Sequence, residues 1–430
     1  MNISEVLIGI KENAFTPLFA QLYGDSQETL EHQKYRYTKA VESFMALYPQ
    51  YDDVKLFSAP GRTEIGGNHT DHQHGCVLAA AVNLDVIAVV AFHNEGVIRV
   101  GSEGYEPFEV YLDDMSVQQG EISSAAMVRG IANRFSEMGV AIGGFDAYTT
   151  SDVIGGSGIS SSAAFETLIG TIIDEHYNDG KAGAVEIAKI GQYAENVYFG
   201  KNSGLMDQMV SSVGGLVSID FFNTQNPAIK SFQYDFEQAG YCIFITDTKG
   251  SHANLTDDYV AIRDEMERVA VFFGKQYLRE VEEREFFAAL PEIRKVCSDR
   301  AILRAAHFFD ENKRAVLETE ALEKGNVEEF LTLVRQSGES SANLLQNLYS
   351  CSKATNQEIP LAIMMSKRIL NGRGAVRVHG GGFAGTIQAF VPLDLADEYI
   401  KEMDRIYGEK SCMKMQIRPF GGIEITKECE

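Results

Sequence analysis

Apolar and polar residues follow two kinds of pattern along this chain. Short apolar runs bounded by glycine, asparagine or proline predict strands, and apolar residues three and four positions apart predict helices. We therefore expect helices over residues 1–50, 123–138, 161–177 and 184–198, and strands that begin at residue 56 or cover residues 86–92, 97–100, 108–112, 145–149 and 214–220. The longest apolar region, residues 77–92, is interrupted by Asn83 and Asp85, which predicts two buried strands joined by a bend.

The pattern changes near residue 225. The polar stretch 223–227 ends in proline, so we expect a boundary between a first domain of residues 1–225 and a second domain of residues 226–430. The second domain is expected to contain a strand at 241–246, charged helices within 256–346, strands on both sides of a glycine-rich turn at 375–391, a helix at 394–407 and a strand at 413–418. Strand and helix alternate here, which predicts a second α+β unit.

Composition and charge narrow the class of protein. Hydrophobic residues make up 45% and charged residues 23% of the 430 residues, which is typical of a globular protein with two or three domains. The formal net charge of −23 disfavours nucleic acid and anionic membranes as partners. The first residues lack a basic segment followed by a long apolar run, and residues 77–92 are too short and too polar to span a bilayer. We expect neither a signal peptide nor a membrane span.

The cysteines indicate the redox environment. There are six of them, scattered along the chain without a C-x-x-C pair. This arrangement argues against a zinc site and against a disulfide scaffold, and it fits a reducing compartment. We therefore expect a cytoplasmic protein.

The most informative segment for function is residues 155–164, in which glycines give way to serines and then to alanines that open a helix. The free N–H groups and the dipole of a helix N-terminus favour an anion, and glycines let the backbone approach it closely. The segment predicts a phosphate-binding loop formed by Gly155, Gly156, Ser157, Gly158, Ser160, Ser161 and Ser162. It contains no Walker motif, and Ser161 stands where a dinucleotide-binding loop has its third glycine. A serine-capped helix without a ligand is the alternative.

A second segment, residues 60–72, places an arginine, two carboxylates, two histidines and several glycines next to apolar strands. Asp71 can accept hydrogen bonds from hydroxyls, while Asn68 and His69 can donate and accept, so we expect a small ligand with several hydroxyls. A polar surface loop is the alternative. A zinc site within residues 69–74 is disfavoured, because the histidines lack the spacing of H-E-x-x-H and no remote ligand is evident.

Two further segments carry candidate chemistry. Asp207 stands beside apolar residues and a glycine, where it fits a partly buried base or a helix cap, and Glu195 lies twelve residues earlier on a predicted helix. Either acid alone is more often structural. Residues 379–385 contain four glycines between two predicted strands, which requires unusual backbone or the close approach of a ligand or another loop.

Taken in order, these four segments resemble the motifs of the sugar kinases in the galactokinase, homoserine kinase, mevalonate kinase and phosphomevalonate kinase superfamily, and most closely those of the galactokinases. Residues 61–72 follow the opening signature G-R-x-N-L-I-G-E-H-x-D-Y, and residues 155–164 follow the phosphate loop G-G-G-L-S-S-S-A-A. Residues 204–208 match G-I-M-D-Q, and residues 380–385 match the third, glycine-rich motif. The resemblance runs from residue 56 to the C-terminus.

The resemblance implies a two-lobed α+β sugar-kinase fold, with an N-terminal lobe like domain 2 of ribosomal protein S5, a ferredoxin-like C-terminal lobe and the site between them. It implies phosphorylation of a sugar at its anomeric hydroxyl, with ATP and Mg²⁺ as cofactors. In that reaction Asp207 would accept the hydroxyl proton and Arg62 would pair with Asp207. The implied Mg²⁺ ligands are Ser162 and Glu195, and the implied sugar contacts are Asn68, His69, Asp71, Gly204 and Tyr259. We expect the sugar and ATP as partners, and a monomer or a small homo-oligomer.

The chain departs from the family at a few positions. Glu64 stands where the family has asparagine and Asn68 where it has glutamate, while His72 and Ala384 replace a tyrosine and a glycine. The family's glutamate at the position of Asn68 contacts the sugar's C6 hydroxyl, so we expect galactose still to be phosphorylated with weaker discrimination at C6. A kinase for N-acetylgalactosamine or arabinose is an alternative, and so is a non-catalytic sugar sensor, which the intact phosphate loop and catalytic pair disfavour.

Overall fold

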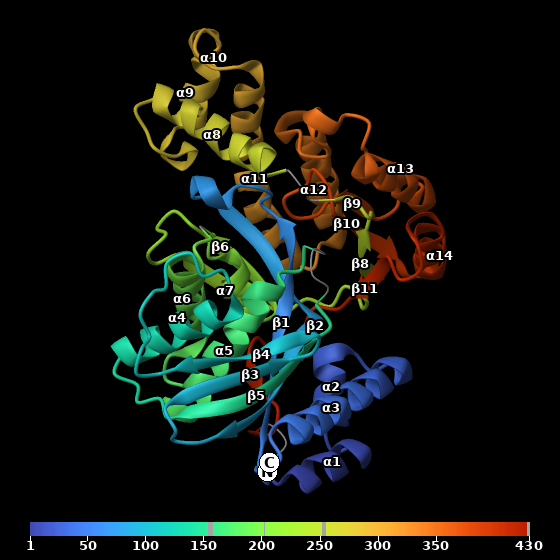
Figure 1. The fold of residues 1–430 in the computed structure, drawn as a ribbon. Helices are drawn as coiled ribbons and strands as arrows, with labels where there is room; N and C mark the ends of the chain where they lie inside the picture. Colours follow the sequence, from blue (N-terminus) through green and yellow to red (C-terminus); the bar gives the residue numbers. More distant parts are fainter. Residues whose placement is uncertain (154–157, 202, 252–254, 428–430) are drawn as a thin grey trace.

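Two β-sheets covered by helices form the fold (Figure 1). The computed structural model describes residues 1–153, 158–201, 203–251 and 255–427. The helices are α1 (Ile3–Lys11), α2 (Thr16–Tyr23), α3 (Gln27–Leu47), α4 (Ser124–Glu137), α5 (Ser161–Tyr177), α6 (Gly183–Tyr193), α7 (Met206–Val213), α8 (Thr256–Phe272), α9 (Glu283–Ala288), α10 (Leu290–Ile293), α11 (Asp299–Glu323), α12 (Val327–Ser340), α13 (Glu358–Leu370) and α14 (Ala396–Tyr407). The strands are β1 (Lys55–Gly66), β2 (Cys76–Phe92), β3 (Val97–Ser102), β4 (Tyr105–Tyr111), β5 (Gly144–Ser151), β6 (Leu216–Asp220), β7 (Ala228–Phe232), β8 (Tyr241–Asp247), β9 (Ala375–Val378), β10 (Thr386–Pro392), β11 (Cys412–Met415) and β12 (Ile423–Glu424). The predicted α+β class is confirmed.

The first sheet has the strand order β12-β1-β2-β5-β3-β4, and β6 and β7 extend it from β2. Side chains of a strand point alternately to its two faces. Along β2, Ala88 and Val90 join the core formed with α4, α5 and α6, whereas Ile87 and Val89 join the core formed with α1, α2 and α3. Helices therefore cover both faces, which explains the nearly continuous apolar run of β2 (Figure 1).

Strand β2 corrects one expectation. The sequence predicts two strands joined by a bend within residues 77–92, but β2 is a single strand. Its polar residues do not interrupt it, because distant groups satisfy them. The side-chain oxygen of Asn83 accepts a hydrogen bond from the backbone N–H of Gln416 at 2.9 Å. Asp85 has hydrogen-bond partners on several elements. The polar residues Asn83 and Asp85 therefore do not end the strand.

Asp85 is the centre of a buried polar cluster between α1–α3 and the first sheet. Its Oδ1 accepts from Arg36 at 2.6 Å, and its Oδ2 accepts from Tyr23 at 2.6 Å and from Arg418 at 2.9 Å. The hydroxyl of Ser58 also donates to Oδ2. Burial opposes ionisation of Asp85, but the two arginine charges and the hydroxyl donors outweigh it and lower the pKa of this carboxyl. The cluster ties the N-terminal helices, the first sheet and the end of the chain together.

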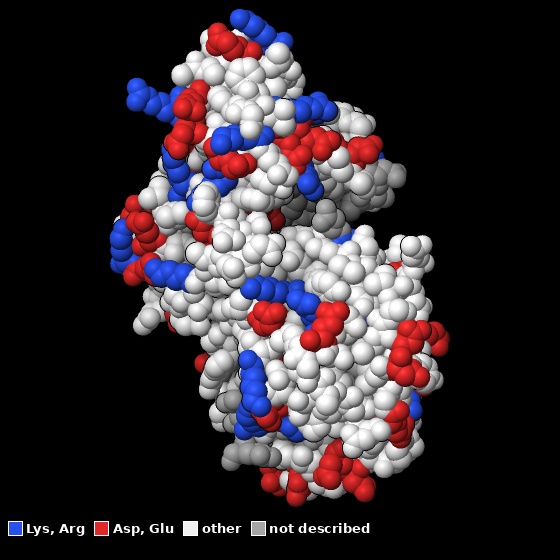
Figure 2. Space-filling view, turned by 90° about the vertical axis from the view of Figure 1, so that its left-hand side faces the viewer, with Lys and Arg blue, Asp and Glu red and all other residues white. Residues whose placement is uncertain are grey.

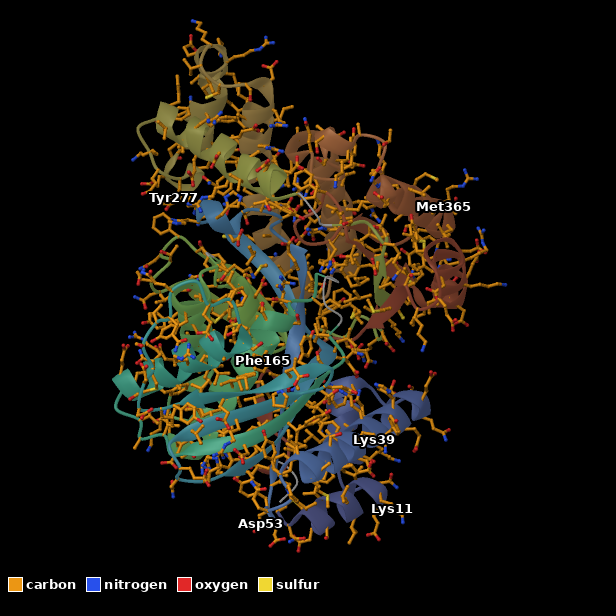
Figure 3. All side chains as sticks on the ribbon, in the orientation of Figure 1. Lys11, Lys39, Asp53, Phe165, Tyr277 and Met365 are labelled. Carbon is orange, nitrogen blue, oxygen red and sulfur yellow. The ribbon has the colours of Figure 1, made fainter. Side chains whose placement is uncertain are left out.

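The hairpin of β1 and β2 presents the polar loop of residues 67–75. The register between the two strands shifts after Pro60 and again after Glu64, and such bulges re-aim the side chains beside them. Within the loop, His74 stacks on Tyr277 with ring centroids 3.7 Å apart. Tyr277 is labelled in Figure 3 beside this end of the hairpin. The loop is therefore held against the segment that follows α8.

The second sheet has the order β11-β8-β10-β9. Helix α12 packs on one face, and α13 and α14 pack on the other. The chain then returns to the first sheet, where Glu424 of β12 pairs with Phe57 of β1. The sequence pattern missed β12, β7 and α13. Strand β12 has two residues, too few to show a period, and β7 is mostly exposed, so it lacks an apolar face.

On the face drawn in Figure 2, lysine and arginine side chains are interspersed with aspartate and glutamate. Within the described ranges, no helix combines the length and the apolar character needed to cross a membrane.

Candidate active site

Arg62 and Asp207, which are 145 residues apart in the sequence, form a bidentate ion pair. Arg62 follows the first bulge of β1, and Asp207 lies in the first turn of α7. Nε of Arg62 donates to Oδ1 of Asp207 at 2.8 Å, and Nη2 donates to Oδ2 at 2.6 Å. The side chains are 12% and 29% exposed, so the pair is shielded but still reachable by a ligand. The structure thus brings together the two residues that the resemblance implies for catalysis.

The surroundings of Asp207 keep it ionised. Burial opposes the charge, but the charge and hydrogen bonds of Arg62, the hydroxyl of Ser160 and the charge of Lys201 outweigh it and lower the pKa of Asp207. The carboxylate is therefore available at neutral pH as a hydrogen-bond acceptor for a hydroxyl group.

The end of the predicted phosphate loop lies against Arg62. The backbone N–H of Arg62 donates to the carbonyl of Ile159 at 2.9 Å, and its Nη1 donates to the carbonyl of Gly158. A Cβ on Gly158 would lie 3.2 Å from Nδ1 of His379, so this loop also touches the third glycine-rich segment. Ser161 is exposed at the start of α5. Three further members of the predicted loop, Gly155, Gly156 and Ser157, lie outside the described residues.

Glu195 lies on η2 (Ala194–Phe199), a π-helical continuation of α6, and π-helical turns often occur at functional sites. Its Oε1 accepts from Ser162 at 3.4 Å and from Lys201 at 2.6 Å. Its Oε2 accepts from Gln208 at 2.9 Å and from Ser203. The two residues implied as metal ligands, Ser162 and Glu195, are thus in contact. Their oxygens are of the kind that Mg²⁺ prefers, and Lys201 places a positive charge beside the carboxylate.

Asn68 connects the first and third motifs. It is 1% exposed, and its Nδ2 donates to Glu64 at 2.9 Å and to the carbonyl of Gly380 at 2.7 Å. Its Oδ1 accepts from Asn347 at 2.9 Å and from Ser341 at 3.4 Å. The four hydrogen-bonding positions of this amide are therefore taken by protein groups.

Glu64, the other member of the exchanged pair, is buried in an ion pair. Its Oε1 accepts from Nη2 of Arg377 on β9 at 2.6 Å, and Arg377 is fully buried. Arg377 also donates to the backbone carbonyls of Ile65 and Val378. The carboxylate of Glu64 is thus directed toward Arg377 on the second sheet.

The remaining sugar-contact candidates lie at two places: Asp71 and Gly204 lie together before α7, and His69 and Tyr259 contact the third glycine-rich segment. A Cβ on Gly204 would lie 3.0 Å from Oδ2 of Asp71, and burial raises the pKa of Asp71. Nε2 of His69 lies 2.9 Å from the carbonyl of Gly381, and the hydroxyl of Tyr259 donates to that of Gly382 at 2.9 Å. A cavity of about 230 Å³ adjoins this region, and its lining includes Asp71, His72, Gly204, Arg263 and Tyr277.

Two family models match this chain. The galactokinase galactose-binding signature matches residues 42–92, which contain Arg62, Asn68, His69 and Asp71. The N-terminal domain of the GHMP kinases matches residues 126–215, which contain the phosphate loop, Glu195 and Asp207. The chain thus contains the N-terminal domain of the GHMP kinases. Because it also carries the galactokinase signature, the predicted class of ATP-dependent sugar kinase is confirmed.

Solved kinase structures share the fold of this chain. Lactococcus lactis galactokinase complexed with galactose matches with a TM-score of 0.76 and 23% identity, over 89% of this chain and 98% of that chain. The Methanococcus jannaschii mevalonate kinase matches with a TM-score of 0.60 and 15% identity, over 85% of this chain and 98% of that chain. Streptococcus pneumoniae phosphomevalonate kinase in complex with phosphomevalonate and AMPPNP matches with a TM-score of 0.58 and 12% identity. The match covers 86% of this chain and 99% of that chain.

Sequence reasoning missed two acids that support the candidate site. Glu166, one turn along α5 from Ser162, is fully buried and accepts from Nε2 of Gln208 at 2.9 Å. Burial, followed by the charge of Glu195, raises the pKa of Glu166 well above its usual value. A glutamate inside the apolar stripe of α5 was the available signal.

The second missed acid, Glu311 on α11, anchors the polar loop of this kinase. Its Oε1 accepts from the backbone N–H groups of Gly67 and Asn68, both at 3.3 Å. Ser337 of α12 donates to the same oxygen at 2.6 Å. Its position among charged helix residues gave no sequence signal, because the contact depends on how α11 crosses the hairpin.

Proposed function

We propose that this GHMP kinase transfers the γ-phosphoryl group of ATP to the anomeric hydroxyl of galactose, giving galactose 1-phosphate and ADP. The main support is the ion pair of Arg62 and Asp207, in which an ionised carboxylate lies within 2.7 Å of a serine hydroxyl at the start of α5. Phosphoryl transfer has a loose transition state, so positioning and charge stabilisation supply most of the catalysis. These residues provide both beside a helix N-terminus that favours phosphate.

In this proposal the sugar hydroxyl donates a hydrogen bond to Asp207, which orients its oxygen toward the γ-phosphorus. The new O–P bond forms as the bond between the γ-phosphorus and the bridging oxygen to the β-phosphate breaks. The hydroxyl proton passes to the carboxylate of Asp207, and ADP leaves with the bridging oxygen. Arg62 and the N–H groups at the start of α5 stabilise the charge on the transferring group. Asp71, Gly204 and Tyr259 surround the remaining ring hydroxyls.

Mg²⁺ fits the oxygens of Ser162 and Glu195 together with nucleotide phosphates, because Mg²⁺ is commonly held by one or two carboxylates and by substrate phosphates. Bound there, it would neutralise phosphate charge. Lys201, whose Nζ lies 2.6 Å from the Glu195 carboxylate, would then compete with Mg²⁺ for that carboxylate.

The test is ATP consumption with Mg²⁺ against galactose, N-acetylgalactosamine, galactosamine, arabinose, 6-deoxygalactose, glucose, mevalonate and homoserine. Galactose turnover that is lost in Asp207→Ala supports the proposal. Turnover confined to another sugar would replace the substrate but keep the reaction. Sugar binding without any turnover would favour a sensor.

The exchanged pair leads to a prediction about C6. We expect the wild-type kinase to accept 6-deoxygalactose and arabinose more readily than its Glu64→Asn/Asn68→Glu double variant does. In the wild type the Asn68 amide is fully engaged, whereas the variant returns a carboxylate to position 68 without changing net charge. A hydrogen bond to a charged group is the stronger one, so we expect the preference for galactose to rise about tenfold, measured as a ratio of kcat/KM values.

The double variant is the appropriate comparison because Asn68→Glu alone would place two carboxylates next to Arg377. Arg377 retains its two backbone carbonyl partners in the double variant, and thermal unfolding checks that the fold persists. Equal rejection of 6-deoxygalactose and arabinose, which both lack the C6 hydroxyl, by wild type and variant would contradict the prediction.

Glu195→Gln tests the metal assignment. We expect the Mg²⁺ concentration for half-maximal rate to rise by about tenfold or more, since changes around metal ligands commonly cost 10–100-fold in affinity. The rate is measured across a Mg²⁺ titration at saturating ATP and galactose. Glu137→Gln, an exposed change on α4, serves as control. An unchanged Mg²⁺ requirement would remove Glu195 from the metal site.

A further inference from the structure

Ser160 has an unusual conformation for a serine that precedes a helix. As the residue before α5 it has φ 60° and ψ 72°, in the left-handed region that non-glycine residues rarely adopt. A serine at this position usually accepts a hydrogen bond from a backbone N–H of the first turn, but Ser160 makes no such capping bond. Its hydroxyl donates instead to Oδ2 of Asp207 at 2.7 Å. Strained backbone of this kind gathers at functional sites.

Asp207 has a limited number of positions for hydrogen bonds. A carboxylate offers about four, two on each oxygen. Oδ2 receives Nη2 of Arg62 and the hydroxyl of Ser160, and Oδ1 receives Nε of Arg62. Among the residues that the structure describes, the acceptor position that remains is therefore on Oδ1.

We infer that Ser160 is a positioning residue for Asp207, which fills Oδ2 so that the reacting hydroxyl of the substrate is received on Oδ1. This inference rests on the proposed function, since it concerns the same hydroxyl. It gives Ser160 a role toward the carboxylate in addition to its place in the phosphate loop. The two oxygens of Asp207 thus differ: two protein donors occupy Oδ2, whereas one occupies Oδ1 and leaves it able to accept from the substrate.

The backbone around Ser160 supports a fixed geometry. The carbonyls of Gly158 and Ile159 both accept from Arg62, through its side chain and its backbone N–H. A Cβ on Gly61 would lie 2.8 Å from the carbonyl of Ile159, so the loop packs directly against the backbone of β1. Arg62 therefore contacts both this loop and the carboxylate of Asp207, and the hydroxyl of Ser160 contacts the same carboxylate.

The test compares Ser160→Ala and Ser160→Gly with Ser161→Ala. Glycine tolerates the left-handed conformation, so Ser160→Gly removes the hydroxyl while relieving the backbone, and Ser160→Ala removes it while retaining the strain. We expect both to lower kcat about tenfold, the effect of losing one hydrogen bond to a charged group, with KM values for ATP and galactose within about twofold of wild type. Ser161→Ala, which changes an exposed serine in the first turn of α5, is expected to raise KM for ATP instead.

A second readout does not depend on turnover. The hydroxyl of Ser160 favours the charged form of Asp207, so its loss raises the pKa of Asp207, which is followed by NMR of labelled carboxyl carbons. The other charged or titratable groups that act on Asp207 are unchanged in these variants: Arg62, Lys201, Asp71, Glu166 and His379.

The outcomes separate the inference from the proposed function. Wild-type inactivity toward galactose removes the proposed substrate, while a pKa rise in both Ser160 variants still supports the contact. Full kcat in Ser160→Gly, or a raised KM for ATP with kcat and the pKa of Asp207 unchanged, overturns the inference and leaves Ser160 as a nucleotide contact only.

Discussion

Asp207→Ala is expected to lower kcat for galactose by about 10²- to 10⁴-fold, the usual contribution of a positioned acid–base group. The variant removes the acceptor that we propose orients the sugar hydroxyl, and it leaves Arg62 without its bidentate partner. KM for ATP is expected to change much less, because in the proposed reaction Asp207 contacts the sugar hydroxyl and not the nucleotide. Initial rates at saturating ATP and Mg²⁺, measured over a range of galactose concentrations, separate the two effects.

The matched control is Asp394→Ala. Asp394 also forms a two-bonded ion pair with an arginine, Arg373, but both side chains are more than half exposed and belong to the second sheet's periphery. We expect this variant to retain the wild-type kcat. Thermal unfolding of Asp207→Ala confirms that any loss is chemical. If kcat of Asp207→Ala stays within threefold of wild type, the carboxylate is not the acceptor in the reaction.

Asp85→Ala is expected to reduce the free energy of unfolding by about 3–5 kcal/mol, the usual cost of breaking a buried ion pair by removing one partner. The change leaves Arg418 buried without its carboxylate and leaves Arg36 with only Asp152, at 3.3 Å, as a carboxylate partner. Tyr23 and Ser58 each lose Asp85 as an acceptor. Urea unfolding followed by circular dichroism measures the loss.

Two comparisons sharpen this result. Glu42→Ala removes an exposed ion pair with Lys39 and is expected to leave the unfolding midpoint near that of wild type.

The second comparison is the stability of wild type and variant in acid. Because the folded-state pKa of Asp85 is lowered, its contribution is present above the unfolded value of about 4 and is lost as the pH falls through the folded value. The difference in the free energy of unfolding between wild type and Asp85→Ala should therefore become smaller in strong acid. A midpoint unaffected by Asp85→Ala would contradict the central role of this cluster.

Local patterns predicted much of the fold. The apolar stripe of residues 161–177 matches the bounds of α5, and the short apolar runs correspond to β3, β5, β8 and β10. The pairing of Arg62 with Asp207 was implied by ordered motifs, and the side chains do meet. These features were accessible because each depends on the period of one element or on a contiguous motif.

Other features depend on contacts between distant residues and left no local mark. Asp85 interrupts an apolar run, yet β2 continues because arginines 49 residues before it and 333 residues after it supply its partners. Asn68 fits a sugar contact by motif, but Asn347 and Gly380 occupy its amide. The contact of Ser160 with Asp207 requires a left-handed backbone that the serine run does not indicate.

The return of the chain to its first sheet bears on how the protein is made. Strand β12 supplies the edge partner of β1, the backbone N–H of Ile425 donates to Leu56 at 2.8 Å, and Arg418 completes the cluster around Asp85. During synthesis these groups emerge more than 300 residues after the strands that they complete. A nascent chain or fragment that stops near residue 225 therefore exposes an unpaired strand edge and a half-neutralised buried acid. The first sheet reaches its final stability only after the second sheet has been translated.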